Sequence, residues 1–241
     1  MMVEVIVCML ILLYACYRDI KEKSVTNVLW LIMIAIGIPF AIYNMITLGK
    51  PFLIAFSYSI VFTFALSYLF FKFSLFGGAD AKCLMGISVL IPYYHTTTIP
   101  DPFPFAITTL LNAAIVSVTV PVFLFLYNLL RLNTKRGDIA ASFTGYKVPI
   151  ADLGRKRRDL RLVHVYEDEG GAIRRKFIFG GLEIDNGIIA ELKGYQEQGK
   201  IESGIWVTPE LPFMLFITVG FFISVLYGNL IFYILAHFIF A

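Results

Sequence analysis

Residues 75–82 read Leu75-Phe76-Gly77-Gly78-Ala79-Asp80-Ala81-Lys82, and they separate two apolar stretches of the chain. An ionisable group next to or inside a bilayer is costly, so such groups are usually present for function. A second acid, Asp19, stands at the end of the first apolar stretch. Asp80 and Asp19 are therefore the first candidates for functional residues.

The composition indicates a membrane protein. Hydrophobic residues make up 59% of the 241 positions, which is more than one soluble core needs. The apolar stretches cover about 1–17, 28–48, 52–73, 82–91, 103–130 and 211–241. Because a helix needs roughly 20 residues to cross the hydrocarbon, the fourth stretch is expected to be short or helped across by its flanks.

These stretches predict a polytopic α-helical membrane protein with six transmembrane helices. The first stretch lacks a basic leading segment and an Ala-x-Ala-type cleavage site, which favours a retained helix over a signal peptide. Among the short connections, the first and third carry five basic residues together, whereas the second carries only Lys50 and the fourth none. The positive-inside rule then predicts cytoplasmic first, third and fifth connections, with both termini outside the plasma membrane.

The segment 131–207 differs from the rest, because it holds 14 of the 20 Lys and Arg residues. Alternating residues over 161–166 and 176–179 predict strands, and a helix is expected over about 186–198 with its N-cap near Asp185. We therefore expect a small cytoplasmic α+β insertion over 131–207, between transmembrane helices 1–5 in residues 1–130 and helix 6 in residues 208–241. Its basic runs at 155–158 and 174–176 favour a solvated face or acidic membrane lipids over nucleic acid.

The topology places both candidate acids on the cytoplasmic side, because Asp19 follows the first helix and Asp80 precedes the fourth. Two carboxylates that converge on one site are typical of acid/base chemistry. Taken alone, Asp19 also fits one charge of a wet interfacial loop. Asp80 also fits an N-cap of the fourth helix, and Gly77 and Gly78 before it permit a close approach or a positive φ.

No metal or organic cofactor is expected. The three cysteines lie in or beside apolar stretches without a Cys-x-x-Cys pair, and the three histidines are scattered.

The run from Gly77 to Lys82 resembles the Gly-x-Gly-Asp motif of membrane-embedded aspartic peptidases, and the chain as a whole is similar to the archaeal preflagellin peptidases. These are relatives of the type IV prepilin peptidases. Asp19, followed by Val25-Thr26-Asn27, matches the position of the other catalytic aspartate. The proline-leucine element of that family is matched by Pro209, Leu211 and Pro212. Ala79 stands where many relatives have a second glycine.

The resemblance implies an aspartic endopeptidase with Asp19 and Asp80 as catalytic residues, supported by Gly77, Gly78, Lys82 and the proline-leucine element. It implies removal of a short basic leader from preflagellin (archaellin) precursors at the cytoplasmic face of the membrane. The absence of Cys-x-x-Cys pairs argues against the N-methylation that bifunctional bacterial relatives perform. Lys82 either tunes the pKa of Asp80 or marks the cytoplasmic boundary. The acidic residues 167–169 are a further hypothesis for attracting the leader.

Three other functions stay open. Pilin-like precursors are alternative substrates of the same mechanism. A proton-coupled transporter using Asp80 belongs to another class, and would be expected to have inverted repeats and acids near mid-membrane. A scaffold that recruits assembly factors would not need either aspartate. The oligomeric state is left open.

Overall fold

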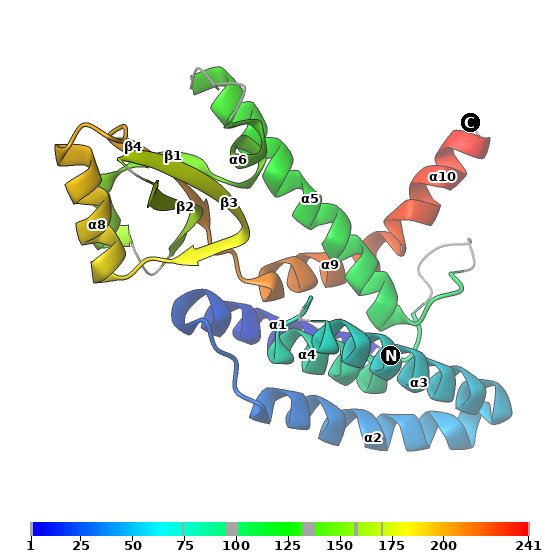
Figure 1. Ribbon diagram of the computed structural model, residues 1–241. Coiled ribbons are helices and arrows are strands. Elements are labelled where there is room, and N and C mark those ends of the chain that lie inside the picture. The colour runs from blue at the N-terminus through cyan, green and yellow to red at the C-terminus, as the bar shows by residue number, and fades with distance from the viewer. Residues whose placement is uncertain are drawn as a thin grey trace. The chain divides into compact units, whose positions relative to one another are not determined.

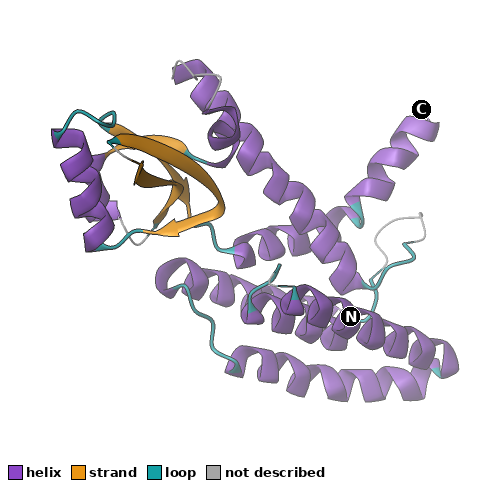
Figure 2. Ribbon diagram, in the orientation of Figure 1, coloured by secondary structure: helices purple, strands orange, loops and turns teal. Residues whose placement is uncertain are grey.

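The computed structural model describes residues 2–73, 75–94, 101–131, 138–156, 159–169 and 171–240, and it divides into two compact units (Figure 1). The first unit comprises Met1–Ser117 and Pro212–Ala241, and the second comprises Val118–Leu211. The described strands all belong to the second unit (Figure 2). A mostly helical chain with a small inserted sheet is the arrangement expected from the sequence.

Helices alone build the first unit. They are α1 (Met2–Glu22), α2 (Val28–Leu48), α3 (Lys50–Lys72), α4 (Gly78–Leu90), the start of α5 (Phe105–Arg131), α9 (Phe213–Tyr227) and α10 (Leu230–Phe240). Within the described residues, α2, α3 and α5 are long and apolar enough to cross a membrane. The chain is therefore a membrane protein.

Helix α4 is short, as expected from its apolar stretch, and it is the most enclosed helix of the first unit. Eight of its 13 residues are buried, and it contacts α1, α2, α3 and α9. A helix surrounded on all sides needs no polar face, which explains why its sequence lacks amphipathic periodicity. Asp80 in its first turn is thus held by a rigid, packed element.

The last apolar stretch differs from expectation, because it forms two helices rather than one. Helix α9 ends at Tyr227 and is capped by Gly228, whose φ of 72° is open to glycine but strained for other residues. The side chain of Asn112 on α5 makes hydrogen bonds with the backbone groups at the break between the two helices. Its Nδ2 donates to Gly228 O at 2.8 Å, and its Oδ1 accepts from Leu230 N at 3.0 Å. Irregular backbone within apolar segments needs such internal partners.

The second unit is a four-stranded antiparallel sheet in the order β1-β4-β2-β3. Its strands are β1 (Tyr146–Pro149), β2 (Leu160–Glu169), β3 (Ala172–Glu183) and β4 (Gly204–Pro209). Its helical elements are the end of α5, α6 (Ile139–Thr144), the 3-10 turn η2 (Ile150–Asp152), α7 (Leu153–Lys156) and α8 (Asn186–Glu197).

The core of this unit lies between the sheet and α8. Buried side chains from η2, α7, three strands and α8 form one cluster, whose fully buried members include Leu153, Leu162, Leu192 and Val207. The predicted helix over 186–198 and its cap are confirmed, since Asp185 Oδ1 accepts from Ile188 N at 2.7 Å. The predicted strands at 161–166 and 176–179 are confirmed as parts of β2 and β3.

Candidate active site

Asp80 is the third residue of α4 rather than its N-cap. The N-cap is Gly77, and the carboxylate of Asp80 reaches back to accept the Gly77 N–H at 3.1 Å. The N-cap role that the sequence left open for Asp80 is therefore wrong: the N-cap lies three residues earlier, at Gly77, and the carboxylate of Asp80 binds the N-cap backbone instead of the N–H groups of the first turn. A carboxylate in the first turn is still favourable, since it lies at the positive end of the helix dipole.

Gly77 and Gly78 do not use positive φ angles. Gly77 has an extended backbone with φ −69°, and Gly78 is the first helical residue. A Cβ added to Gly77 would lie 3.1 Å from Asp80 Oδ2, whereas one added to Gly78 would lie 3.6 Å from Phe71 Cε2, an ordinary contact. The close approach that glycine permits is therefore needed at position 77 and not at position 78.

Asp19 lies in the last turn of α1, half-buried, where its carboxylate accepts a hydrogen bond from the backbone N–H of Met214. Met214 is the second residue of α9, so its N–H is one of the donors that a helix start leaves without an intrahelical partner. Both candidate acids thus receive a backbone N–H from the beginning of a helix. Met214 was missed from the sequence, because a main-chain donor leaves no signature in the residue type.

The charge of Asp19 acts on the carboxyl group of Asp80. Asp19 lies just after the first apolar stretch, which ends at Tyr17, and Asp80 lies just before the fourth, which begins at Lys82. Burial raises the pKa of Asp80 to about 6, the Gly77 N–H lowers it, and the negative charge of Asp19 raises it. Burial also raises the pKa of Asp19, against the Met214 N–H, which lowers it. The fold therefore brings the two predicted acids into one electrostatic environment.

Lys82 binds a residue other than Asp80, the partner that one of its two expected roles required. Its Nζ donates to Asn27 Oδ1 at 2.8 Å, and Asn27 stands at the N-cap of α2. Burial, Gly77 and Asp19 account for the pKa of Asp80, and Lys82 is not among its causes. The amine ties the start of α2 to α4, which favours a positioning role over tuning of the carboxylate.

Aromatic packing holds the loop before Asp80. Phe76 packs edge-on against Phe70 of α3, with ring centroids 4.9 Å apart, and against Phe213 of α9 at 5.4 Å. Pro212 is the N-cap of α9, so the proline-leucine element ends where the helix that binds Asp19 begins. Phe76 and Phe213 were not singled out from the sequence, although each adjoins a motif residue.

The rest of the proline-leucine element belongs to the second unit. Pro209 is the last residue of β4, and Leu211 has 43% of its surface exposed. Both line a groove of that unit together with Glu210. Within the described residues, no group of three or more His, Cys, Asp or Glu side chains is arranged to hold a metal ion.

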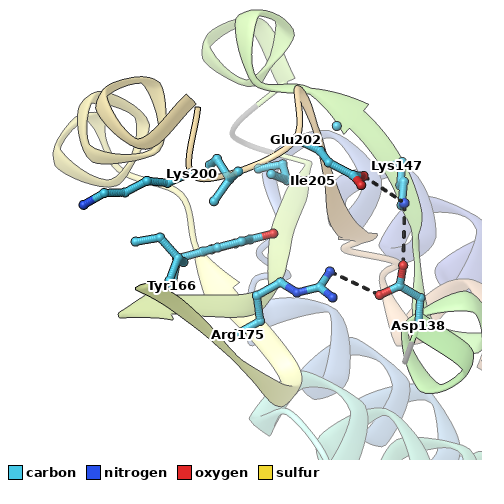
Figure 3. Close-up of a pocket in the computed structure, with 10 residues that line it drawn as sticks. Asp138, Lys147, Tyr166, Arg175, Lys200, Glu202 and Ile205 are labelled. Atoms are coloured by element: carbon cyan, nitrogen blue, oxygen red, sulfur yellow. Dashed lines mark hydrogen bonds and ion pairs between the residues drawn. The ribbon is translucent and has the colours of Figure 1, made fainter. Parts of the chain in front are cut away.

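A separate polar pocket of about 150 Å³ lies in the second unit (Figure 3). Asp138, only 1% exposed, is bound by Arg175 at 3.2 Å and by Lys147 at 3.6 Å, and Lys147 also reaches Glu202 at 3.7 Å. Lys200 points away from this cluster in Figure 3 and pairs with Asp168 at 2.6 Å. The acids and bases of this pocket neutralise one another, which is typical of a structural network.

The same ion pair weakens the hypothesis on residues 167–169. Asp168 lies in β2, where Lys200 Nζ and the Gly171 N–H both donate to its carboxylate. The hydrogen bond from Lys200 and that from Gly171 lower the pKa of Asp168. This charge is already matched within the unit, so it is a poor receptor for a basic leader.

The fold and the site together define a class: a helical membrane protein with two interacting, partly buried carboxylates, each bound by the backbone of a helix start. Residues 6–127, half of the chain, match the type IV leader peptidase family, and residues 137–230 match the family described as archaeal peptidase A24 C-terminus type II. The chain belongs to the type IV leader peptidase family, and it is a protease by that membership.

Curated relatives are similar over almost the whole chain. The preflagellin peptidase of Methanococcus voltae is 26% identical over 237 residues, covering 90% of this chain and 92% of the relative. That of Methanococcus maripaludis strain C6 is 27% identical over 240 residues, covering 95% and 96%. That of Methanocaldococcus jannaschii is 25% identical over 244 residues, covering 95% of each.

The contact between Gly77 and Asp80 yields a paired prediction. In Gly77→Ala the added methyl group displaces the carboxylate, and we expect peptidase kcat to fall about tenfold or more, since small misplacements of reacting groups are costly. In Gly78→Ala the methyl group meets only an ordinary contact, so kcat should stay near that of the parent protein. Steady-state kinetics of both variants provide the measurement, and equal activities would contradict the assigned contact.

The network around Asp138 yields a stability prediction. The double variant Lys147→Met, Arg175→Met leaves a buried carboxylate without a cation, and we expect the free energy of unfolding to drop by about 3–5 kcal/mol. Adding Asp138→Asn removes the stranded charge and should restore much of the loss. Unfolding is followed by Trp206 fluorescence in a Trp30→Phe background, because the chain has two tryptophans. A triple variant no more stable than the double variant would refute the assignment.

Proposed function

We propose that this chain is an aspartic endopeptidase that removes the short basic leader from preflagellin (archaellin) precursors, with Asp19 and Asp80 as the catalytic pair. The observation that carries the proposal is the interaction between these two acids, which lie in different helices. A pair of carboxyl groups can hydrolyse a peptide bond by acid/base catalysis without a metal ion. The supporting residues of the proposal are Gly77, Gly78, Lys82, Pro209, Leu211 and Pro212.

The choice of substrate rests on the relatives. Three of them are named preflagellin peptidase and cover nearly the whole chain. Pilin-like precursors would be cut by the same chemistry, so they belong in the same assay. Membrane lipids are the expected surroundings, and the two termini are assigned to the outside by the distribution of basic residues.

In this proposal the chain crosses the plasma membrane six times. Helices α1 to α5 contribute one crossing each, and α9 with α10 makes the last. The catalytic pair then faces the cytoplasm at the edge of the bilayer. A substrate whose leader remains in water while its apolar helix enters the lipid presents its junction at that depth.

Hydrolysis needs one protonated and one ionised carboxyl group. The ionised group accepts a proton from water, and the water oxygen attacks the scissile carbonyl carbon. The protonated group hydrogen-bonds the carbonyl oxygen as it becomes negative. When the tetrahedral intermediate collapses, the amine takes a proton and departs, which leaves one proton on the pair for the next cycle.

The environment of the two carboxyl groups favours one protonated and one ionised group. Burial and the charge of Asp19 both raise the pKa of Asp80. Covering by an apolar substrate would raise it further, because removal of water disfavours a second negative charge. Two coupled carboxyl groups titrate as a unit, so the retained proton belongs to the pair. The pair can also tighten when the substrate binds.

Replacement of either acid tests the proposal. In Asp19→Asn and in Asp80→Asn, cleavage of a preflagellin precursor in membranes should fall by about 10³-fold, the scale of general acid/base catalysis. The matched control is Asp152→Asn, an exposed acid of the second unit, which should cleave at the parent rate.

Each rival function predicts a different result. A scaffold would leave cleavage by both variants at the parent rate. A transporter would lose proton flux in proteoliposomes with Asp80→Asn while the parent protein cleaved no precursor. Running pilin precursors beside preflagellin in the same membranes tells the two substrate classes apart.

A further inference from the structure

The start of α9 carries one of the two backbone donors that bind the catalytic pair. Met214, the second residue of this helix, gives its N–H to the Asp19 carboxylate on α1. Within the first unit α9 lies against α1, and its Phe221 ring packs edge-on against Phe105 of α5 with centroids 5.6 Å apart (Figure 1). The N–H can stay on Asp19 only while the first turns of α9 keep their place on α1.

Thr218, one helical turn after Met214, is a polar side chain at the contact between α9 and α1. It is buried, and its Oγ1 donates to Met214 O at 2.8 Å and also lies 3.4 Å from Leu12 O. A hydroxyl group has one proton, so Met214 O is its main acceptor and Leu12 O a weaker one. The Thr218 side chain makes a further hydrogen bond with Cys16. One hydroxyl group therefore joins the first turn of α9 to two successive turns of α1.

The partners of Thr218 lie on the same face of α1 as Asp19. Leu12, Cys16 and Asp19 follow one another at spacings of four and three residues, which stack on one side of a helix. Leu12 meets Thr218, and Asp19 meets Met214, so the two helices run antiparallel along this face. Cys16 interacts with both Thr218 and Asp19. The contact of Thr218 is therefore next to that of the catalytic carboxylate.

Different contacts hold the later turns of α9 on α5. A Cβ added to Gly220 would lie 2.5 Å from Thr109 O, so the backbones of the two helices touch at this glycine. One turn later, Ser224 Oγ accepts from Asn112 Nδ2 at 2.8 Å. These contacts fix the middle and the end of α9 from the α5 side. Thr218 acts at the other end and on the other neighbour, where Asp19 is bound.

We infer that Thr218 is a positioning residue of the catalytic pair, whose hydroxyl group fixes the first turn of α9 on α1 and thereby holds the Met214 N–H on Asp19. This inference rests on the proposed function and extends it beyond the two acids. Thr218 acts through Met214 and takes no part in the chemistry. Release of the N–H would let the Asp19 carboxylate turn away from the orientation that hydrolysis needs.

The first test separates positioning from substrate binding. Thr218→Val replaces the hydroxyl group with a methyl group and keeps the branched shape of the side chain. We expect kcat for a preflagellin precursor to fall about fivefold, the scale of one hydrogen bond, while KM stays within about twofold of the parent value. Thr218→Ser keeps the hydroxyl group and should restore kcat. A parent-like kcat in Thr218→Val, or a Thr218→Ser variant as slow as Thr218→Val, would overturn the inference.

The matched control removes another buried hydroxyl group from the same helix. Ser224→Ala deletes a side chain that binds Asn112 of α5 and has no contact with the α1 residues that bind Thr218. It should lower the stability of the protein by an amount similar to that of Thr218→Val and leave kcat at the parent value. If both variants lost kcat equally, a general loosening of α9 would be the cause, and the positioning role would be refuted.

The amide proton of Met214 provides a spectroscopic test that does not depend on activity. In protein labelled with ¹⁵N-methionine, its signal is the one that Met214→Leu removes. A hydrogen bond to a carboxylate is stronger than one to a neutral amide, so Asp19→Asn should lower the proton chemical shift. Thr218→Val should move the signal in the same direction, but should add little in an Asp19→Asn background. An unchanged signal in Thr218→Val would contradict the inference.

The two assays together tell a failed positioning role from a failed function. If the parent enzyme cleaves the precursor and Thr218→Val matches it in kcat and in the Met214 signal, only the role of Thr218 is wrong. If the parent enzyme cleaves no precursor, the proposed function itself has failed. The Met214 signal then decides alone whether Thr218 holds the N–H on Asp19.

Discussion

The hydrogen bonds from two helix starts to two carboxylates are the interactions on which the site depends. Gly77 N–H binds Asp80, and Met214 N–H binds Asp19. A partly buried carboxylate loses hydration, and backbone donors at the positive end of a helix replace part of it. The end of α1 and the starts of α4 and α9 therefore have to lie close together. The short, buried α4 and the aromatic contacts of Phe76 serve that requirement.

The second requirement is that irregular backbone near apolar segments stays satisfied. Asn112 fulfils it at the break between α9 and α10, and Asn128 fulfils it at the end of α6. Both amides lie on α5, one in each unit. Helix α5 thus carries the polar groups that fix the ends of its neighbours, which explains buried asparagines in a helix apolar enough to cross a membrane.

Much of this arrangement was predictable from the sequence, because apolar stretches and period-two alternation report burial directly. Asp80 and Asp19 could be selected as candidates because charges beside apolar stretches are rare. Gly77 could not be identified as the N-cap from the sequence, because glycine caps a helix through its backbone and has no capping side chain to recognise. Met214 was not predicted because it contributes a main-chain N–H. The helix break at Gly228 was not predicted because the apolar stretch around it has an ordinary composition.

Lys82 and the acidic residues 167–169 illustrate a second limit. One of the two roles left open for Lys82 was to act on Asp80, and a further hypothesis had the acids attract a ligand, whereas Lys82 binds Asn27 and Asp168 binds Lys200. Charged side chains are long enough to reach several partners, so the packing around them determines which partner they bind.

The most direct test of the central claim is an infrared titration of the carboxyl groups in the purified, membrane-reconstituted protein. The band assigned to protonated Asp80, by its loss in Asp80→Asn, should titrate near pH 6 in the parent protein. Removing the neighbouring charge in Asp19→Asn should lower that apparent pKa, because Asp19 helps to raise it. An Asp80 band that titrates at the same pH in both proteins would contradict the account, since it would mean that the two acids do not share one site.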